Sequence, residues 1–247
     1  MTRPSWPYGW THDFEKDLVV EKDYIFRKDE TRRPPNEVNP SDRFELHAGD
    51  VSKQDQECAR KDGVARARAE RAQPPEQALQ DEGSEHWYAW SFFVESGFPE
   101  SASGKGKAWE QVTLTQFMQR PDVLDEYLPA FMFAKRRDSD FVLRYFPHLG
   151  RDGSQAWPII SHHQFVGVWH KLVVHIKWTY KADGFVKVWL NDNSSPVVNK
   201  MLATRTKGSG GVYHKYGIYR IDDAGSASTV VYFSRLRHGK TRAEVDE

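Results

Sequence analysis

The chain of 247 residues has almost no cysteine and no long apolar run. Cys58 is the only cysteine, so no disulfide can form within the chain, and cysteine usage leaves the compartment open. No apolar run approaches the roughly 20 residues of a membrane-spanning helix. No signal-peptide pattern follows Met1. The sequence therefore predicts no membrane partner.

Net charge is also absent. Lys and Arg together number 35, and Asp and Glu together number 35 as well. General binding to nucleic acid needs a bulk positive excess, so no nucleic-acid partner is expected. A balanced total still permits a local basic groove.

Helical periodicity is scarce, and strand-like alternation takes its place. In 169–180, Leu172, Val174, Ile176 and Trp178 alternate with more polar residues, which is typical of a half-buried strand. Similar stretches, separated by turn residues, are 86–95, 111–120, 140–146, 184–190 and 228–239. Many short strands with turns between them predict an all-β sandwich or barrel.

The pattern favours one domain over residues 1–247, with two less regular parts. Residues 1–40 read as a loosely ordered strap with one short strand, and residues 50–85 as a polar excursion that includes one polar strand. Pro74 and Pro75 interrupt the excursion.

The stretch 211–220 carries the first candidate site. Tyr213, Lys215, Gly217 and Tyr219 occupy every second position, so in a strand they share one face at spacings of about 6.5–7 Å. Gly217 would leave a gap where a ligand approaches the backbone. The alternative is a solvated strand face with a glycine bulge.

Three other stretches also gather polar side chains on one strand face. They are Arg43, Glu45 and His47; Arg66, Arg68 and Glu70; and Gln116, Met118 and Arg120. Each alone is explained by a ladder of cross-strand ion pairs. Together with the Tyr/Lys strand, they predict one basic concave sheet whose ligand is a polyanion.

The stretch 213–220, YHKYGIYR, resembles the Y-x-K-x-G-x-Y signature of jelly-roll polysaccharide lyases. These include alginate lyases, the heparin lyase I family and glucuronan lyases. Their R-x-E-L strand resembles RFEL at 43–46, with a second candidate, RAER, at 68–71, and their Q-x-H strand resembles QFM at 116–118. The resemblance covers roughly residues 40–237. It implies a jelly-roll β-sandwich with a concave substrate-binding sheet, and an enzyme that cleaves an anionic polysaccharide by β-elimination.

The resemblance also implies residue roles. The implied catalytic residues are Tyr219, His47 and Gln116, and the implied substrate-binding residues are Arg43, Arg68, Arg120, Tyr213 and Lys215. Tyr219 would protonate the departing O4 oxygen. Such a protein is expected to be a secreted or periplasmic monomer without a cofactor.

One position departs from the family pattern. Met118 stands where the family has a histidine, and a thioether cannot move a proton. Three explanations stay open: His47 serves as the base, Tyr219 performs both proton transfers, or catalysis is lost. A single tyrosine suits D-glucuronate and D-mannuronate, whose C5 hydrogen and O4 lie on the same side of the ring. A glucuronan-like substrate is therefore favoured over the guluronate blocks of alginate.

Other functions have less support in the sequence. A non-catalytic carbohydrate-binding protein of the same fold is the main alternative, and a hydrolase would need a pair of unpaired carboxylates. His162, His163, His170 and His175 lack the spacing of a metal-ligand set, so no metal is predicted. A structural calcium ion at 191–196 is another alternative, but a hairpin turn explains that segment better.

Overall fold

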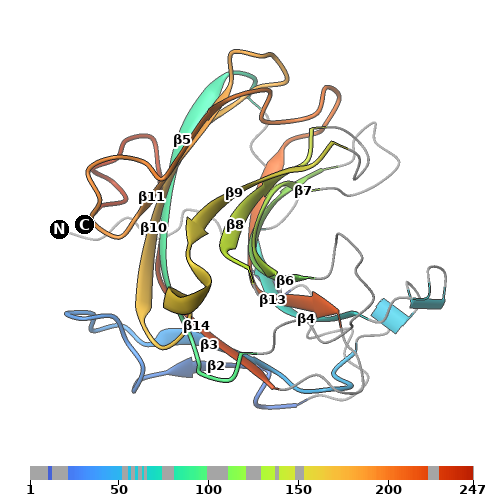
Figure 1. The fold of residues 1–247 in the computed structure, drawn as a ribbon, viewed down its shortest axis with the longest axis vertical. Helices are drawn as coiled ribbons and strands as arrows, with labels where there is room; N and C mark the ends of the chain where they lie inside the picture. The colour runs from blue at the N-terminus through green and yellow to red at the C-terminus, as the bar shows by residue number, and fades with distance from the viewer. Residues whose placement is uncertain are drawn as a thin grey trace.

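The fold, obtained as a computed structural model, is an antiparallel β-sandwich (Figure 1). The structure describes residues 11–12, 22–51, 55–56, 59–60, 63, 66–73, 81–98, 111–120, 129–136, 139–147, 153–221 and 228–246. The first sheet, called the curved sheet here, consists in spatial order of β1 (Thr11–His12), β4 (Arg66–Ala72), β13 (Val212–Ile221), β6 (Gln111–Gln119), β7 (Pro129–Arg136), β8 (Phe141–Tyr145) and β9 (Gln155–Ile160).

The second sheet, called the back sheet here, packs against the curved sheet. Its strands in spatial order are β12 (Val198–Met201), β11 (Phe185–Leu190), β10 (Trp169–Trp178), β5 (Ser84–Val94), β14 (Thr229–Gly239), β3 (Ser41–Leu46) and β2 (Phe26–Asp29). Figure 1 shows the curved sheet bending so that its concave face turns away from the back sheet, toward the right of the view. Together the sheets confirm the predicted jelly-roll β-sandwich with a concave sheet.

The core lies between the sheets and follows from the alternation in each strand. Leu172, Val174, Ile176 and Trp178 of β10 are all fully buried, as predicted. Aromatic side chains of the curved sheet, such as Phe117, meet this face. Each such side chain contributes roughly 1.5–3 kcal/mol by leaving water. The core therefore fixes which residues of every strand are left for the outer faces.

The two less regular parts of the prediction contain ordered strands. Residues 26–29 of the predicted strap form β2, and residues 66–72 of the predicted excursion form β4, next to β13. Much of the rest of both segments, including residues 1–10, 13–21 and 74–80, lies outside the described residues. Among the described residues, no helix is long and apolar enough to cross a membrane.

Gly217 is required by the backbone of the neighbouring strand. The β13–β6 register shifts between Tyr216 and Tyr219, and Gly217 has a φ of 138°. A Cβ atom at residue 217 would lie 2.1 Å from the carbonyl oxygen of Ala69 on β4. The glycine bulge, rather than an opening for a ligand, therefore accounts for this residue.

Three histidines lie inside the sandwich or at its edge and stay neutral. His86 and His214 are buried, and His238 is half-buried. His86 Nδ1 lies 2.6 Å from His238 Nε2, and Lys240 Nζ lies 2.9 Å from His86 Nε2. Burial, with smaller contributions from neighbouring positive charge, lowers the pKa of His86 and His214 to about 3 and the pKa of His238 to about 4.

These histidines should make the free energy of unfolding fall as the pH drops below about 6.5. In that range the unfolded chain takes up protons that the folded chain excludes, which costs about 1.4 kcal/mol per pH unit for each neutral histidine. The loss should continue down to the folded pKa values. Urea unfolding curves at several pH values between about 7.5 and 4.5 would measure this slope.

A matched pair of variants tests the origin of the slope. His214→Phe keeps an aromatic ring against Phe117, on which His214 stacks at 4.7 Å, and should reduce the slope by about one proton. Phe133→Leu, which also changes a buried aromatic ring beside Phe117 but removes no titratable group, should leave the slope unchanged. An unchanged slope in His214→Phe would show that other groups take up the protons.

Candidate active site

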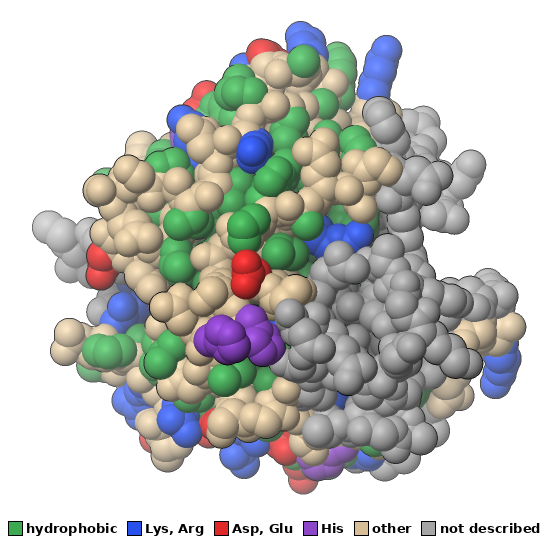
Figure 2. Space-filling view, in the orientation of Figure 1, with side chains coloured by type: hydrophobic (Ala, Val, Ile, Leu, Met, Phe, Trp, Pro, Cys, Tyr) green, Lys and Arg blue, Asp and Glu red, His purple; other side chains and the backbone are tan. Residues whose placement is uncertain are grey.

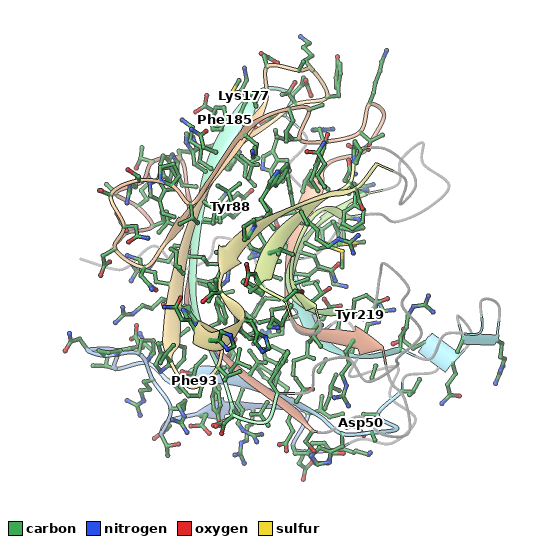
Figure 3. The ribbon with its side chains drawn as sticks, viewed as in Figure 1. Asp50, Tyr88, Phe93, Lys177, Phe185 and Tyr219 are labelled. Atoms are coloured by element: carbon green, nitrogen blue, oxygen red, sulfur yellow. The ribbon has the colours of Figure 1, made fainter. Side chains whose placement is uncertain are left out.

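β13 presents three of the predicted site residues on the concave face of the curved sheet. Tyr216 and Ile218 point into the core, so Tyr213, Lys215 and Tyr219 point the other way. Tyr219 is half-buried on this face (Figure 3). The alternation predicted for 211–220 is thus present in the structure.

The strands on both sides of β13 add polar groups to the same face. Tyr219 pairs with Arg68 of β4, and Lys215 pairs with Gln116 of β6. Because side chains opposite each other in neighbouring strands lie close together, these four residues form one cluster. The structure therefore brings together Arg68, Gln116, Tyr213, Lys215 and Tyr219, as the sequence predicted.

Glu70 lies at the centre of this cluster. Its Oε1 accepts a hydrogen bond from Gln116 Nε2 at 2.5 Å, and its Oε2 lies 2.9 Å from Lys215 Nζ. All three residues are buried, with no more than 4% of the surface of any exposed. This contact fixes the orientation of both the Gln116 amide and the Lys215 ammonium.

Arg68 is held over the ring of Tyr219 by a buried carboxylate. Its Nε donates to Asp55 Oδ2 at 2.9 Å, and its Nη2 makes a second bond to Asp55 Oδ1. The guanidinium carbon lies 4.5 Å from the centroid of the Tyr219 ring. Burial opposes the charge of Arg68, but Asp55 more than compensates and raises the pKa of the guanidinium. Tyr219 therefore faces a permanent cation.

Met118 occupies an apolar corner of the same face. It pairs with Tyr213 across β6 and β13, and the two form a buried cluster with Ala72. This is the position at which the resembled family carries a histidine. A thioether packed against Ala72 and a tyrosine ring cannot take a proton from substrate.

Arg144, which was not among the predicted site residues, extends this face away from β13. The register runs from Gln116 to Met132 of β7 and on to Arg144 of β8. Arg144 is buried on this face and its Nη2 donates to Ser154 Oγ at 3.1 Å. The alternation within 141–145, where Phe141, Leu143 and Tyr145 enter the core, was the signal that could have identified it.

Arg120 follows β6 at the edge of the cluster. Its backbone N–H donates to the carbonyl of Gly211, and its own carbonyl accepts from Gly210. These bonds tie the end of β6 to the start of β13. Its side chain is half-buried, and its role as a substrate ligand stays a prediction.

Arg43 and His47 do not join the cluster, so the prediction of one shared surface is wrong for this stretch. β3 lies between β14 and β2 in the back sheet, with Phe44 and Leu46 in the core. Arg43 and Glu45 therefore face outward on the opposite side of the sandwich. Alternation fixes which residues share a face, but it does not fix which sheet a strand joins. The R-x-E stretch next to β13 is the one at 68–71.

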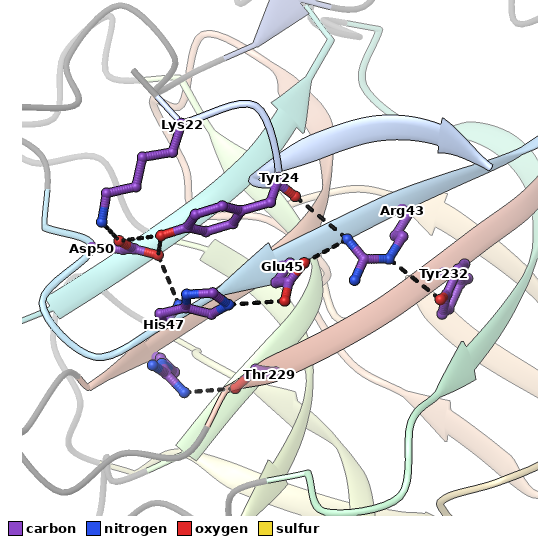
Figure 4. A network of polar contacts seen from close by, with 9 residues as sticks. Lys22, Tyr24, Arg43, Glu45, His47, Asp50, Thr229 and Tyr232 are labelled. Atoms are coloured by element: carbon purple, nitrogen blue, oxygen red, sulfur yellow. Dashed lines mark hydrogen bonds and ion pairs between the residues drawn. The ribbon is translucent and has the colours of Figure 1, made fainter. Parts of the chain in front are cut away.

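The residues around β3 form a polar network of their own (Figure 4). Arg43 Nη1 lies 2.6 Å from Glu45 Oε2, and His47 Nε2 lies 2.8 Å from Glu45 Oε1. The His47 ring stacks on Tyr24 at 4.2 Å. Burial works against the Glu45 carboxylate, but the bonds from His47 and Arg43 lower its pKa overall. The stretch thus carries ion pairs, as its alternative interpretation expected, but they run along the chain from Arg43 to His47 and not between strands.

His47→Ala should therefore leave catalysis nearly unchanged. The variant loses a ring stack and one hydrogen bond outside the Tyr219 face, which costs about 1–2 kcal/mol of stability at most. The rate on any polymer that the native chain cleaves should stay within about twofold, since no proton-transfer group is lost. Steady-state kinetics would measure this rate. A large loss of rate in a variant that stays folded would show that His47 takes part in catalysis.

The chain matches known proteins at the level of family and of fold. A family model described as "Polysaccharide lyase" matches residues 13–237. No curated protein sequence matches the chain.

Several solved structures share the fold. An endo-β-1,4-glucuronan lyase from the fungus Trichoderma reesei has a TM-score of 0.65 at 15% identity, covering 96% of this chain and 97% of that one. An alginate lyase from Pseudomonas aeruginosa has a TM-score of 0.59 at 14% identity, covering 90% and 88%. An alginate lyase from Aplysia kurodai has a TM-score of 0.56 at 14% identity, covering 88% and 87%. At these identities the shared feature is the fold.

Proposed function

Because the chain belongs to the polysaccharide lyase family, we propose that it cleaves a uronic-acid-containing polysaccharide by β-elimination on the Tyr219 face of the curved sheet. The main support for this proposal is the cluster of polar side chains around Tyr219. A phenol lies under the Arg68 guanidinium, with an ammonium and an amide beside it on the same concave face. These are the groups that the reaction requires.

The reaction removes a weakly acidic proton. The C5 hydrogen of a uronate lies next to a carboxylate anion, so its removal needs the carboxylate to be neutralised and the developing enolate-like charge to be stabilised. Lys215 and Gln116 supply an ammonium and an amide donor for this carboxylate. The C5–H bond breaks, a C4=C5 double bond forms, and the C4–O4 bond breaks as O4 takes up a proton.

Tyr219 is the proposed carrier of the proton. Its oxygen takes the proton from C5 and returns it to O4, so the enzyme ends the cycle in its starting state. Tyr219 accepts the C5 proton as its phenolate, and the Arg68 guanidinium attracts the negative charge that the oxygen carries before it takes up this proton and after it gives the proton to O4. General acid–base groups of this kind typically contribute about 10²–10⁴-fold to the rate.

A D-configured uronate is the proposed substrate, with glucuronan favoured. One tyrosine can serve both proton transfers only when the C5 hydrogen and O4 lie on the same side of the ring. Met118 leaves no second proton carrier at the family position, and His47 lies on the back sheet. The similarity in fold to a glucuronan lyase points the same way. Since such polymers occur outside the cytoplasm, a secreted or periplasmic protein is also proposed.

A non-catalytic polysaccharide-binding protein is the second candidate. Both cations beside Tyr219 are paired with a carboxylate, Arg68 with Asp55 and Lys215 with Glu70. Figure 2, which views the sandwich from the side of Figure 1 and not onto the concave face, shows mainly hydrophobic and uncharged groups on the described surface, with scattered charges of both signs. Because a cation that is already paired with a carboxylate attracts a polyanion less strongly, the pairing of Arg68 and Lys215 favours modest affinity over tight capture of a polyanion.

An ultraviolet assay tests the proposed function. The protein is incubated separately with glucuronan, alginate, heparin and hyaluronan, and the absorbance of the C4=C5 double bond is followed. We expect the fastest increase with glucuronan. Binding without any increase in absorbance would favour the second candidate.

A further inference from the structure

The Glu70 carboxylate reaches across a whole strand to touch two site residues. It belongs to β4, whereas Gln116 belongs to β6, and β13 lies between them. Two strands on either side of a third are about 9.5 Å apart, twice the spacing of neighbouring strands. The 2.5 Å contact between Glu70 and Gln116 therefore needs both side chains to lie over β13.

Gly217 is the residue of β13 that lies opposite Glu70. It pairs directly with Glu70, and it is the one residue of the Tyr/Lys face without a side chain. A Cβ atom at residue 217 would lie 2.8 Å from Glu70 Cα. The backbones of β4 and β13 therefore approach closely at this pair, and from there the Glu70 carboxylate reaches Lys215 and Gln116.

The position of Glu70 has two opposite consequences for an anionic substrate. The carboxylate holds the amide and the ammonium in one orientation, which favours a reaction that depends on their alignment. It also places a negative charge 2.9 Å from the ammonium that is to receive the substrate carboxylate. Like charges a few ångströms apart repel each other, so this contact weakens substrate binding.

We propose that Glu70 is a positioning residue that aligns Lys215 and Gln116 for turnover while it lowers the affinity of the site for polyanions. The inference rests on the proposed function, because the substrate carboxylate is the group that Lys215 and Gln116 would receive. A residue with a purely structural role would not raise affinity when it is lost.

Glu70→Gln tests the charge of this residue. The variant keeps an oxygen that accepts from Gln116 Nε2, but it removes the negative charge beside Lys215. Affinity for glucuronan oligomers should rise about fivefold, since one close charge interaction is worth about 1 kcal/mol in water. The rate constant kcat should fall about 10-fold or more, because Lys215 loses the ion pair with Glu70 that orients its ammonium group.

Glu70→Asp separates the effect of the negative charge from the effect of side-chain length. It keeps the negative charge but is one methylene shorter, so it cannot span β13 to Gln116. Here kcat should fall as in Glu70→Gln, while the affinity should not rise. This variant also gives an answer if Glu70→Gln fails to fold, since removing a carboxylate charge from beside a buried lysine is costly.

Glu45→Gln is the matched control. Like Glu70→Gln, it removes the charge of a carboxylate paired with a basic side chain, here Arg43, but on the back sheet. Binding would be measured by calorimetry with glucuronan oligomers in a Tyr219→Phe background, at low and high salt, and kcat by ultraviolet absorbance in the native background. Glu45→Gln should change neither quantity, and the gain of Glu70→Gln should be larger at low salt.

The outcomes distinguish this inference from the proposed function. If the native chain cleaves a polymer but Glu70→Gln binds no more tightly, the role of Glu70 is overturned and the lyase proposal stands. If the native chain cleaves none of the tested polymers, the lyase proposal fails. Tighter binding by Glu70→Gln would then still support the effect of Glu70 on affinity, and weaker binding would overturn it.

Discussion

Tyr219→Phe should reduce the rate of polymer cleavage by about 10²–10⁴-fold, because the variant removes the group proposed to move both protons. The phenylalanine ring still fills the space beneath the Arg68 guanidinium, 4.5 Å away in the native chain. Polymer affinity should therefore stay within about threefold of the native value, since only one hydrogen bond is lost. Ultraviolet absorbance gives the rate, and calorimetry with the same polymer gives the affinity.

Tyr232→Phe is the control for Tyr219→Phe. Tyr232 also loses only a hydroxyl group, which accepts from Arg43 Nε at 3.3 Å, and it lies on β14 of the back sheet. Its rate should match that of the native chain. A Tyr219→Phe variant with native activity would remove Tyr219 from the mechanism, whatever the control shows.

The local alternation of the chain predicted much of the candidate site. In β13 every second residue is held in the core, so the sharing of one face by Tyr213, Lys215 and Tyr219 follows from the sequence alone. The same reasoning applies to Arg68 on β4 and Gln116 on β6. A period of two fixes these faces wherever one side of a strand is buried.

Long-range pairing could not be predicted in the same way. The stretches around Arg43 and Arg68 show the same alternation, yet β3 joins the back sheet and β4 joins the curved sheet. Which strand lies beside β13 depends on packing between residues far apart in the chain. The motif resemblance offered both stretches and could not choose between them.

Contacts that depend on the register between strands also could not be predicted from the sequence. Glu70 and Gln116 are 46 positions apart and meet only because β4 and β6 both lie beside β13 in the sheet. Asp55 lies in a stretch that reads as a solvated excursion, but its carboxylate is fully buried against Arg68. A charged composition predicts exposure unless a partner is known, and the partner here comes from another element.

Cleavage should be confined to polymers in which the C5 hydrogen and O4 lie on the same side of the ring. Oligomers of D-mannuronate and of L-guluronate make a matched pair, because the two sugars differ only in configuration at C5. The value of kcat/KM on guluronate should be lower than on mannuronate by about 10²-fold or more, the contribution of one missing proton-transfer group. Glucuronan shares the mannuronate geometry and should be cleaved well.

Met118→His tests the physical origin of this restriction. The substitution places an imidazole at the family position, opposite Tyr213 and two residues from Gln116. If the restriction comes from the absence of a second proton carrier, guluronate cleavage should rise in this variant, with a pH dependence near the usual histidine pKa of about 6.5. Mannuronate cleavage should change little, because Tyr219 already serves it. Rapid cleavage of guluronate oligomers by the native chain would contradict the single-tyrosine mechanism, since that geometry needs a proton carrier on each side of the ring.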